Sequence, residues 1–246
     1  MNMFSLDDRR VLVTGANTGI GQAIAVGMAQ AGAEVICAGR RACDETVGLI
    51  EAAGGKAASV PVDFCNPMAG LGLFEGQDID ILVNNAGIIR RADALEFSEV
   101  DWDDVMDVNL KALFFTSQAF ARAVMARSGQ GAVVNIASLL SFQGGIRVPS
   151  YTASKHGVAG LTKLLANEWA ARGINVNAVA PGYIETNNTE ALRADPERNK
   201  AILDRIPAGR WGAASDIAGA AVYLCTPAAR YVHGAVLNVD GGWLAR

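Results

Sequence analysis

Two residues that could move a proton, Tyr151 and Lys155, stand four positions apart in the segment Tyr-Thr-Ala-Ser-Lys. On a helix this spacing places both side chains on one face, one turn apart. A free phenol has a pKa of about 10, too high for an efficient base at neutral pH, and a neighbouring cation lowers it. The pair could therefore take the proton of an alcohol, or donate one to a ketone. The spacing alone is weak evidence, because any helix can contain it by chance.

A glycine-rich turn near the N-terminus reads TGANTGIG over 14–21 and lies between an expected strand over 11–13 and an expected helix over 20–31. Its glycines would permit a tight turn, a close backbone approach to a pyrophosphate and close helix–strand packing. The helix N-terminus would offer free N–H groups and a partial positive charge to that anion. The spacing differs from the usual GxGxxG, but its place favours dinucleotide binding over a plain turn. The predicted contacts are Gly15, Asn17, Thr18, Gly19, Ile20 and Gly21.

Two later strand ends bear on which dinucleotide binds. An acidic residue at the end of the second strand would bind the ribose 2′-OH of NAD, but this chain has Arg40 there. A guanidinium could instead pair with the 2′-phosphate of NADP; alternatively, Arg40 and Arg41 are solvated residues that begin the next helix. Asp63, at the end of the third strand, could accept from the adenine amino group or cap a turn, and Phe64 joins it in the predicted set.

Apolar strand-like runs alternate with helical stretches along the whole chain, which predicts a parallel sheet covered on both faces. We therefore expect an α/β fold of the Rossmann type, a doubly wound sheet of about seven strands in one domain over 1–246. The longest irregular region, about 182–215, follows the sixth strand and could cover a ligand there. Strands are expected over 11–13, 34–38, 57–62, 79–83, 132–136, 174–178 and 235–239, and long helices over 101–127 and 151–172.

Composition excludes several classes of partner. The net charge of −4 gives no electrostatic reason to bind nucleic acid. The 4 cysteines and 2 histidines lack metal-ligand spacing, so no metal site is expected, and free thiols indicate a reducing compartment. Neither a signal peptide nor a run approaching the ~18 apolar residues of a membrane span is present. We expect a cytoplasmic protein without a membrane partner.

The motifs occur together in one order over essentially the whole chain: the glycine turn, Asn-Asn-Ala-Gly at 84–87, Asn109, Ser138, the Tyr/Lys pair and Pro181-Gly182. This set resembles the short-chain dehydrogenase/reductase family. The resemblance implies a catalytic tetrad of Asn109, Ser138, Tyr151 and Lys155. In it, Ser138 polarises the substrate carbonyl and Tyr151 is the acid/base. Lys155 binds the nicotinamide ribose and lowers the Tyr151 pKa, and Asn109 holds a water that connects Lys155 to solvent. The resemblance also implies cofactor contacts from Tyr151 and Lys155 themselves and from Asn85, Ala86, Gly87, Pro181, Gly182, Ile184 and Thr186.

The segments 84–91, 140–151, 180–189 and 239–246 resemble a subgroup of that family. Its members reversibly reduce 2,5-diketo-3-deoxygluconate to 2-dehydro-3-deoxy-D-gluconate in pectin and uronate breakdown. This resemblance favours NAD(H), whereas Arg40 allows NADP(H). The family further implies a homotetramer.

A sugar-acid carboxylate needs a cation near the reacting carbon, and arginine is the usual partner because it pairs bidentately. Arg147, four residues before Tyr151, is the predicted ligand, and a surface salt bridge is the equal alternative for it. The other predicted substrate contacts are Ser138, Tyr151, Gln143, Asn187 and Asn188.

Two other functions remain open. One is a 3-oxoacyl carrier-protein reductase or general ketone reductase of the same family, which would turn over 3-oxoacyl thioesters. The other is a nicotinamide-binding regulator without chemistry, and the filled tetrad argues against it.

Overall fold

The computed structural model describes residues 2–127 and 129–246. They form a seven-stranded sheet in the order β3-β2-β1-β4-β5-β6-β7, with every pair of neighbours parallel. The order reverses between β1 and β4, and ligands of such sheets bind outside the carboxyl ends of the strands at that point. The strands are β1 (Arg10–Thr14), β2 (Glu34–Gly39), β3 (Lys56–Pro61), β4 (Ile81–Asn84), β5 (Gly131–Ile136), β6 (Ile174–Pro181) and β7 (Val236–Val239).

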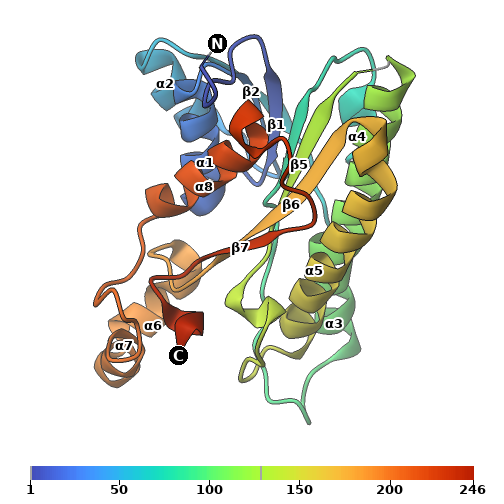
Figure 1. The fold of residues 1–246 in the computed structure, drawn as a ribbon. Helices are drawn as coiled ribbons and strands as arrows, with labels where there is room; N and C mark the ends of the chain where they lie inside the picture. The colour runs from blue at the N-terminus through green and yellow to red at the C-terminus, as the bar shows by residue number, and fades with distance from the viewer. Residues whose placement is uncertain (1, 128) are drawn as a thin grey trace.

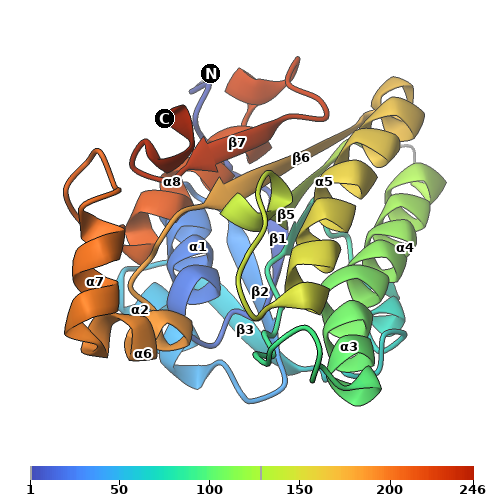
Figure 2. The same ribbon diagram turned by 90° about the horizontal axis from the view of Figure 1, so that it is seen from below.

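Helices cover both faces of the sheet, as Figures 1 and 2 show, so the predicted doubly wound single domain is confirmed. On one face α1 (Gly19–Gln30) packs against α8 (Ala214–Cys225), and α2 (Asp44–Ala52) lies beside α1. On the other face lie α3 (Glu99–Met106), α4 (Leu113–Ala126) and α5 (Pro149–Trp169). None of the described helices combines the length and the apolar character needed to cross a membrane.

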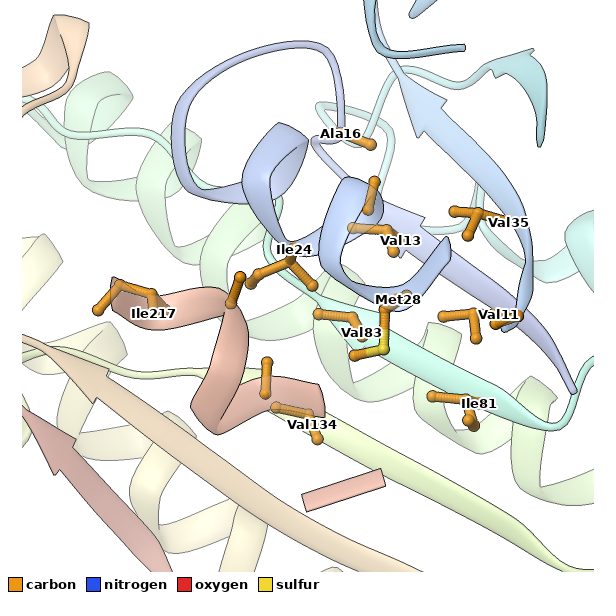
Figure 3. Packing of buried hydrophobic residues seen from close by; sticks show 14 of the residues in the cluster. Val11, Val13, Ala16, Ile24, Met28, Val35, Ile81, Val83, Val134 and Ile217 are labelled. Atoms are coloured by element: carbon orange, nitrogen blue, oxygen red, sulfur yellow. The ribbon is translucent and has the colours of Figure 1, made fainter. Parts of the chain in front are cut away.

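The strands are apolar on both sides because both sides are buried. Val11 and Val13 of β1 pack toward Ile24 and Met28 of α1 (Figure 3), whereas Leu12 belongs to the cluster on the opposite face. Successive side chains of a strand point to opposite faces. The continuous apolar run in β1 therefore follows from a sheet with helices on each side.

One polar pair crosses the core between β4 and β5. Asn84 and Asn135 lie opposite each other, and the Asn84 amide donates to the Asn135 carbonyl oxygen at 2.9 Å. The Asn84 amide also donates to Ser117, and Asn135 donates to Thr162, at 2.9 and 3.0 Å. Both asparagines are buried, and these bonds supply the partners that buried amides need.

The long helix predicted over 101–127 is interrupted. A π-helical segment, Asp107–Ala112, separates α3 from α4. Such segments are rare and are frequent at functional sites, and this one carries Asn109. The helix predicted over 151–172 is α5 followed by a 3₁₀ turn at Ala170–Arg172.

The region predicted to be irregular over 182–215 contains a 3₁₀ turn, Asn187–Thr189, and two helices, α6 (Glu190–Ala194) and α7 (Pro196–Leu203). The start of α7 has a clear local cause. The Asp195 carboxylate accepts from the backbone N–H groups of Glu197 and Arg198, and Pro196 occupies the first turn. The short stretch over 66–76 contains only a 3₁₀ turn, Leu71–Phe74.

Candidate active site

A cleft of about 330 Å³ lies at the carboxyl ends of β1, β4, β5 and β6 and gathers most of the predicted site residues. The chain segments that form it come from the two halves of the sheet and meet where the strand order reverses. The predicted residues that line the cleft are Gly15, Asn17, Thr18, Gly19, Ile20, Gly21, Asn85, Ala86, Gly87, Ser138, Tyr151, Lys155, Pro181, Gly182, Ile184, Thr186, Asn187 and Asn188.

The turn between β1 and α1 is built to hold its backbone close to a ligand. Gly15 and Gly19 have φ of 65° and 59°, which favours glycine. A Cβ on Gly21 would collide with the Gly15 carbonyl and the Asn85 amide. The loop after β4 braces the turn, since the Asn85 amide donates to the carbonyl oxygens of Thr14 and Gly15, both at 3.0 Å.

The N-terminus of α1 opens onto the cleft without a side-chain cap. Thr18 stands at the N-cap and makes no capping hydrogen bond. The first-turn N–H groups therefore keep the capacity to bind an anion, which the helix dipole also favours. Together with the glycine turn, this end of the cleft fits the pyrophosphate of a dinucleotide.

Three residues predicted for the adenosine end lie outside the cleft lining. Arg40 and Asp63 are both exposed. The backbone hydrogen bond from Cys65 lowers the pKa of Asp63, with a smaller contribution from the charge of Arg40, so the two side chains lie near each other. Phe64 is buried against Val108 and Ala112, next to the π-helical segment.

Lys155 is buried beside Tyr151. Its ammonium nitrogen donates to the Ile136 carbonyl oxygen at 2.6 Å and lies 5.5 Å from the centre of the Tyr151 ring. Burial lowers the pKa of Lys155 to about 8, because low-dielectric surroundings disfavour the charged form. The end of β5 therefore fixes the cation next to the phenol.

Tyr151 keeps its proton at neutral pH. Burial raises the pKa of its phenol, and the Ser138 hydrogen bond and the Arg91 charge act in the opposite direction without cancelling it. The structure thus differs from the expected lowering of the Tyr151 pKa. In this state the phenol is a proton donor.

Asn109 lies behind the cleft, where the π-helical segment holds it. Its carbonyl oxygen accepts from the Ile88 N–H at 2.8 Å, and its amide donates to the Ile88 carbonyl at 2.9 Å. The amide is also 3.4 Å from the Ser154 hydroxyl. Asn109 therefore joins the loop after β4, which includes Gly87 and Ile88, to α5, the helix that carries Tyr151 and Lys155.

Of the two alternatives given for Arg147, substrate ligand or surface salt bridge, the structure shows the salt bridge. The Arg147 guanidinium lies 3.1 Å from the Asp93 carboxylate, and both side chains are exposed. The Arg147 backbone has φ of 63°, in the left-handed region. Gln143 also lies outside the cleft lining, and its side chain bonds to Trp243.

Arg91 is a cation near the cleft that the sequence analysis does not single out. Its charge acts on the Tyr151 phenol, and its guanidinium donates to the Asn188 carbonyl at 3.3 Å. The preceding Arg90 is paired with Asp101 and Asp104 instead. The available signal was position, because Arg91 follows the Asn-Asn-Ala-Gly turn at the carboxyl edge of the sheet.

A second hollow and groups of metal-ligating side chains are the alternatives to this cleft in the described chain. A larger hollow of about 560 Å³ lies at the opposite ends of the strands, near Asp80 and Gly131, and holds none of the predicted site residues. Within 2–127 and 129–246, no three His, Cys, Asp or Glu side chains gather as metal ligands.

Comparison with known proteins agrees with the fold and the cleft. Residues 15–244 match the family described as Enoyl-(Acyl carrier protein) reductase. The chain is 55% identical to 2-dehydro-3-deoxy-D-gluconate 5-dehydrogenase of Bacillus subtilis over 99% of this chain and 97% of that protein. The Escherichia coli protein of the same name is 53% identical over 100% of this chain and 99% of its own.

A similar solved structure comes from Agrobacterium tumefaciens and is described as a 2-deoxy-D-gluconate 3-dehydrogenase with bound NADP. Its sequence is 74% identical to this chain, and the match covers 100% of both chains with a TM-score of 0.99. Identity at this level over the full length excludes a chance likeness of folds. The chain therefore belongs to the short-chain dehydrogenase/reductase family of NAD(P)-dependent oxidoreductases.

Proposed function

We propose that the enzyme interconverts 2,5-diketo-3-deoxygluconate and 2-dehydro-3-deoxy-D-gluconate, a ketone and an alcohol of one sugar acid, with NADP(H) as the hydride carrier. The observation that carries the proposal is the position of Arg91, whose guanidinium donates at 3.3 Å to the carbonyl of Asn188, a residue of the cleft lining. The names of the 53–55% identical relatives support the same substrate. A carboxylate on the substrate would be the natural partner of a guanidinium held at the edge of this cleft.

In the proposed mechanism, nicotinamide supplies the hydride when bound. Ser138 and Tyr151 donate hydrogen bonds to the ketone oxygen, and Tyr151 transfers its proton as negative charge develops there. In the reverse direction the Tyr151 phenolate accepts the alcohol proton. Arg91 binds the carboxylate and so orients the reacting carbon toward the cofactor side of the cleft.

Lys155 and Asn109 act behind the phenol. The Lys155 ammonium binds the nicotinamide ribose and favours the phenolate that forms when Tyr151 loses its proton. Asn109, fixed by its two bonds to Ile88, holds a water that connects Lys155 to solvent.

NADP(H) is the proposed cofactor, and this choice departs from the NAD(H) that the subgroup resemblance favours. Arg40 stands after β2 where an NAD enzyme would carry an acid, and its guanidinium suits a 2′-phosphate. The 74% identical Agrobacterium protein was solved with NADP. Asp63 accepts from the adenine amino group, and the Phe64 backbone completes that end.

The segment 182–215 is the proposed cover of the substrate. Asn187 and Asn188 line the cleft and serve as hydroxyl partners. We also place the enzyme in the cytoplasm as a homotetramer, associated through α4, α5 and β7. Large apolar side chains stay exposed on two of these elements, Leu164 on α5 and Leu237 on β7, and sedimentation at working concentration tests the assembly.

Arginine substitutions test the proposed substrate. We expect Arg91→Ala to lower kcat/KM for the diketo sugar acid by about 100-fold, roughly 2.7 kcal/mol of transition-state binding, and to change an uncharged ketone by less than about threefold. Arg147→Ala is the matched control, because its partner is Asp93, and should leave both rates near wild type.

Two outcomes would contradict the proposal. Turnover of 3-oxoacyl thioesters with none of the sugar acid would favour the carrier-protein reductase alternative. Equal losses with charged and uncharged ketones in Arg91→Ala would remove Arg91 as the carboxylate ligand.

A further inference from the structure

The last residues of the chain form a turn that packs against α7 and against the segments that follow β5 and β6. After β7, the Asp240 carboxylate accepts from the N–H groups of Gly242 and Leu244 at 2.9 and 3.0 Å. These bonds fix the 3₁₀ turn Trp243–Ala245 beside α7. Figure 1 shows this turn at the C-terminus, on the side of the sheet where α6 and α7 lie.

Trp243 is the centre of that packing. Its side chain is only 4% exposed, its ring lies 4.7 Å from the Tyr183 ring, and the Arg205 guanidinium stacks over it at 4.0 Å. Tyr183 directly follows Gly182, which lines the cleft. Trp243 therefore touches both the segment after β6 and the end of α7.

The indole of Trp243 also reaches the segment after β5. Its N–H donates to the Gln143 side-chain oxygen at 3.3 Å. An indole nitrogen can only donate, so the group of Gln143 that faces Trp243 must be the carbonyl oxygen. The orientation of the Gln143 amide is thereby fixed.

With its oxygen facing Trp243, Gln143 directs its amide nitrogen away from the indole. Among the described residues 2–127 and 129–246, no oxygen accepts a hydrogen bond from the Gln143 amide nitrogen. Gln143 is half-buried and stands just beyond the turn that begins at Ser138, and its own N–H bonds to Leu139. Two N–H donors of Gln143 thus remain without an acceptor among the described residues, on the segment that follows Ser138 and outside the cleft lining.

We propose that Trp243 is a positioning residue for the substrate, and that it acts by holding Gln143 with its amide N–H groups toward a distal oxygen of the sugar acid. Gln143 is then a donor only and selects substrates that carry an acceptor there. The inference rests on the proposed sugar-acid function and adds to it a residue of the C-terminal turn that does not line the cleft.

Trp243→Phe tests the inference because it keeps an aromatic ring and deletes the N–H donor, together with part of the ring volume that Trp211→Phe also removes. We expect the KM for the sugar acid to rise about three- to tenfold, the effect of one hydrogen bond, with kcat and the NADPH dissociation constant within about twofold. Trp211→Phe is the matched control: it belongs to the same cluster and also contacts Tyr183, but its N–H donates to Asn199. Its KM should stay near wild type.

A double-mutant cycle with Gln143→Ala separates positioning from packing. If Trp243 acts through Gln143, adding Trp243→Phe to Gln143→Ala should not raise the KM further. A second rise of the same size in the double variant would overturn the inference, because it would assign the effect to packing.

The Trp243 indole N–H resonance provides a readout that needs no substrate. It is assigned by its loss in Trp243→Phe and should move in Gln143→Ala, and an unmoved resonance contradicts the Gln143 contact. A wild type that does not turn over the sugar acid refutes the proposed substrate instead, so the two failures are distinguishable.

Discussion

At the residue scale, Tyr151 is the group proposed to exchange a proton with the substrate. Its raised pKa keeps the phenol neutral, so the resting enzyme presents a proton donor to a ketone. Positioned proton transfer contributes about 10²- to 10⁴-fold to a rate.

Tyr151→Phe should therefore lower turnover of the diketo sugar acid by about 1,000-fold while NADPH affinity stays within about twofold. Stopped-flow NADPH oxidation and cofactor fluorescence measure the two quantities. Tyr231→Phe, which alters a 98% exposed phenol, is the control and should behave as wild type. A loss of less than tenfold in Tyr151→Phe would remove Tyr151 from the mechanism.

The buried Lys155 should make the stability of the apoenzyme depend on pH. Its pKa of about 8 in the fold lies below the ordinary 10.5. Between these values the unfolded chain binds more protons, so stability rises with pH through this window. Relative to Lys155→Met, the wild-type free energy of unfolding should increase by about 2 kcal/mol between pH 7 and pH 9.5. Urea unfolding of both proteins at the two pH values measures it, and a constant difference would contradict the burial of the charge.

The sequence predicted the tetrad by residue type and order, but it could not rank the arginines. Arg147 and Arg91 are both close in sequence to predicted site residues. Only the fold shows that Arg147 pairs with Asp93 while the charge of Arg91 acts on Tyr151. Which cation meets a site depends on loop conformation, and a left-handed residue such as Arg147 redirects a loop in a way that residue spacing does not reveal.

At the element scale, the π-helical segment explains how Asn109 joins two parts of the site. Both of its side-chain atoms bond the Ile88 backbone, and its amide approaches Ser154 on α5. Removing this side chain leaves the part-buried N–H and carbonyl of Ile88 without their partner, and an unpaired buried group costs at most about 1–3 kcal/mol.

Asn109→Ala should lower the melting temperature and, because the loop that carries Gly87 loses its anchor, also reduce kcat by at least about tenfold. Asn175→Ala is the control: its amide donates to carbonyls of Arg230 and Val232, at the far end of β6. That variant should lose stability without losing turnover per folded molecule. Identical kcat losses in both variants would show that general destabilisation is sufficient.

The type of an element was predictable where the pattern of apolar residues extended over many positions. It was less predictable where a few local hydrogen bonds determine the backbone conformation. The apolar strands and the helix after Tyr151 were predicted within a few residues. The π-helical insertion was not, because one extra residue in a turn barely changes the pattern of apolar side chains. The helices within 182–215 depend on the Asp195-Pro196 start of α7 and on packing around Trp211 and Trp243. The polar sequence of this segment shows no apolar periodicity from which they could be predicted.

At the scale of the whole molecule, cofactor binding should stabilise the fold in proportion to affinity. A ligand at 100 times its dissociation constant adds about 2.7 kcal/mol, which corresponds to roughly 5–10 °C for a chain of this size. Equal concentrations of NADPH and NADH should therefore raise the melting temperature unequally, with NADPH higher.

Arg40→Ala should abolish most of that difference by reducing only the NADPH shift, since the guanidinium serves the 2′-phosphate. Thermal melts with each cofactor measure it, and the unchanged NADH shift is the internal control. A wild type that melts equally with both cofactors would contradict the preference.

The fold itself was the most predictable part, because a sheet buried on both faces leaves continuous apolar strands such as β1. The strand order and the meeting of the segments after β4, β5 and β6 in one cleft are long-range outcomes that periodicity does not encode. The family resemblance, carried by motifs such as Asn-Asn-Ala-Gly, grouped the site residues into one set, whereas the strand order was not predicted.

The buried Asn84–Asn135 pair also affects how faithfully the site assembles. If β4 slipped by one residue against β5, the Asn84 amide would face Val134 or Ile136, and both amides would lose partners in the core. Buried unpaired amides are costly, so misaligned pairings of these strands are disfavoured during folding. The segments that carry Asn85 and Ser138 begin directly beyond these two strands, so a polar contact deep in the sheet helps to fix where Asn85 and Ser138 lie relative to each other.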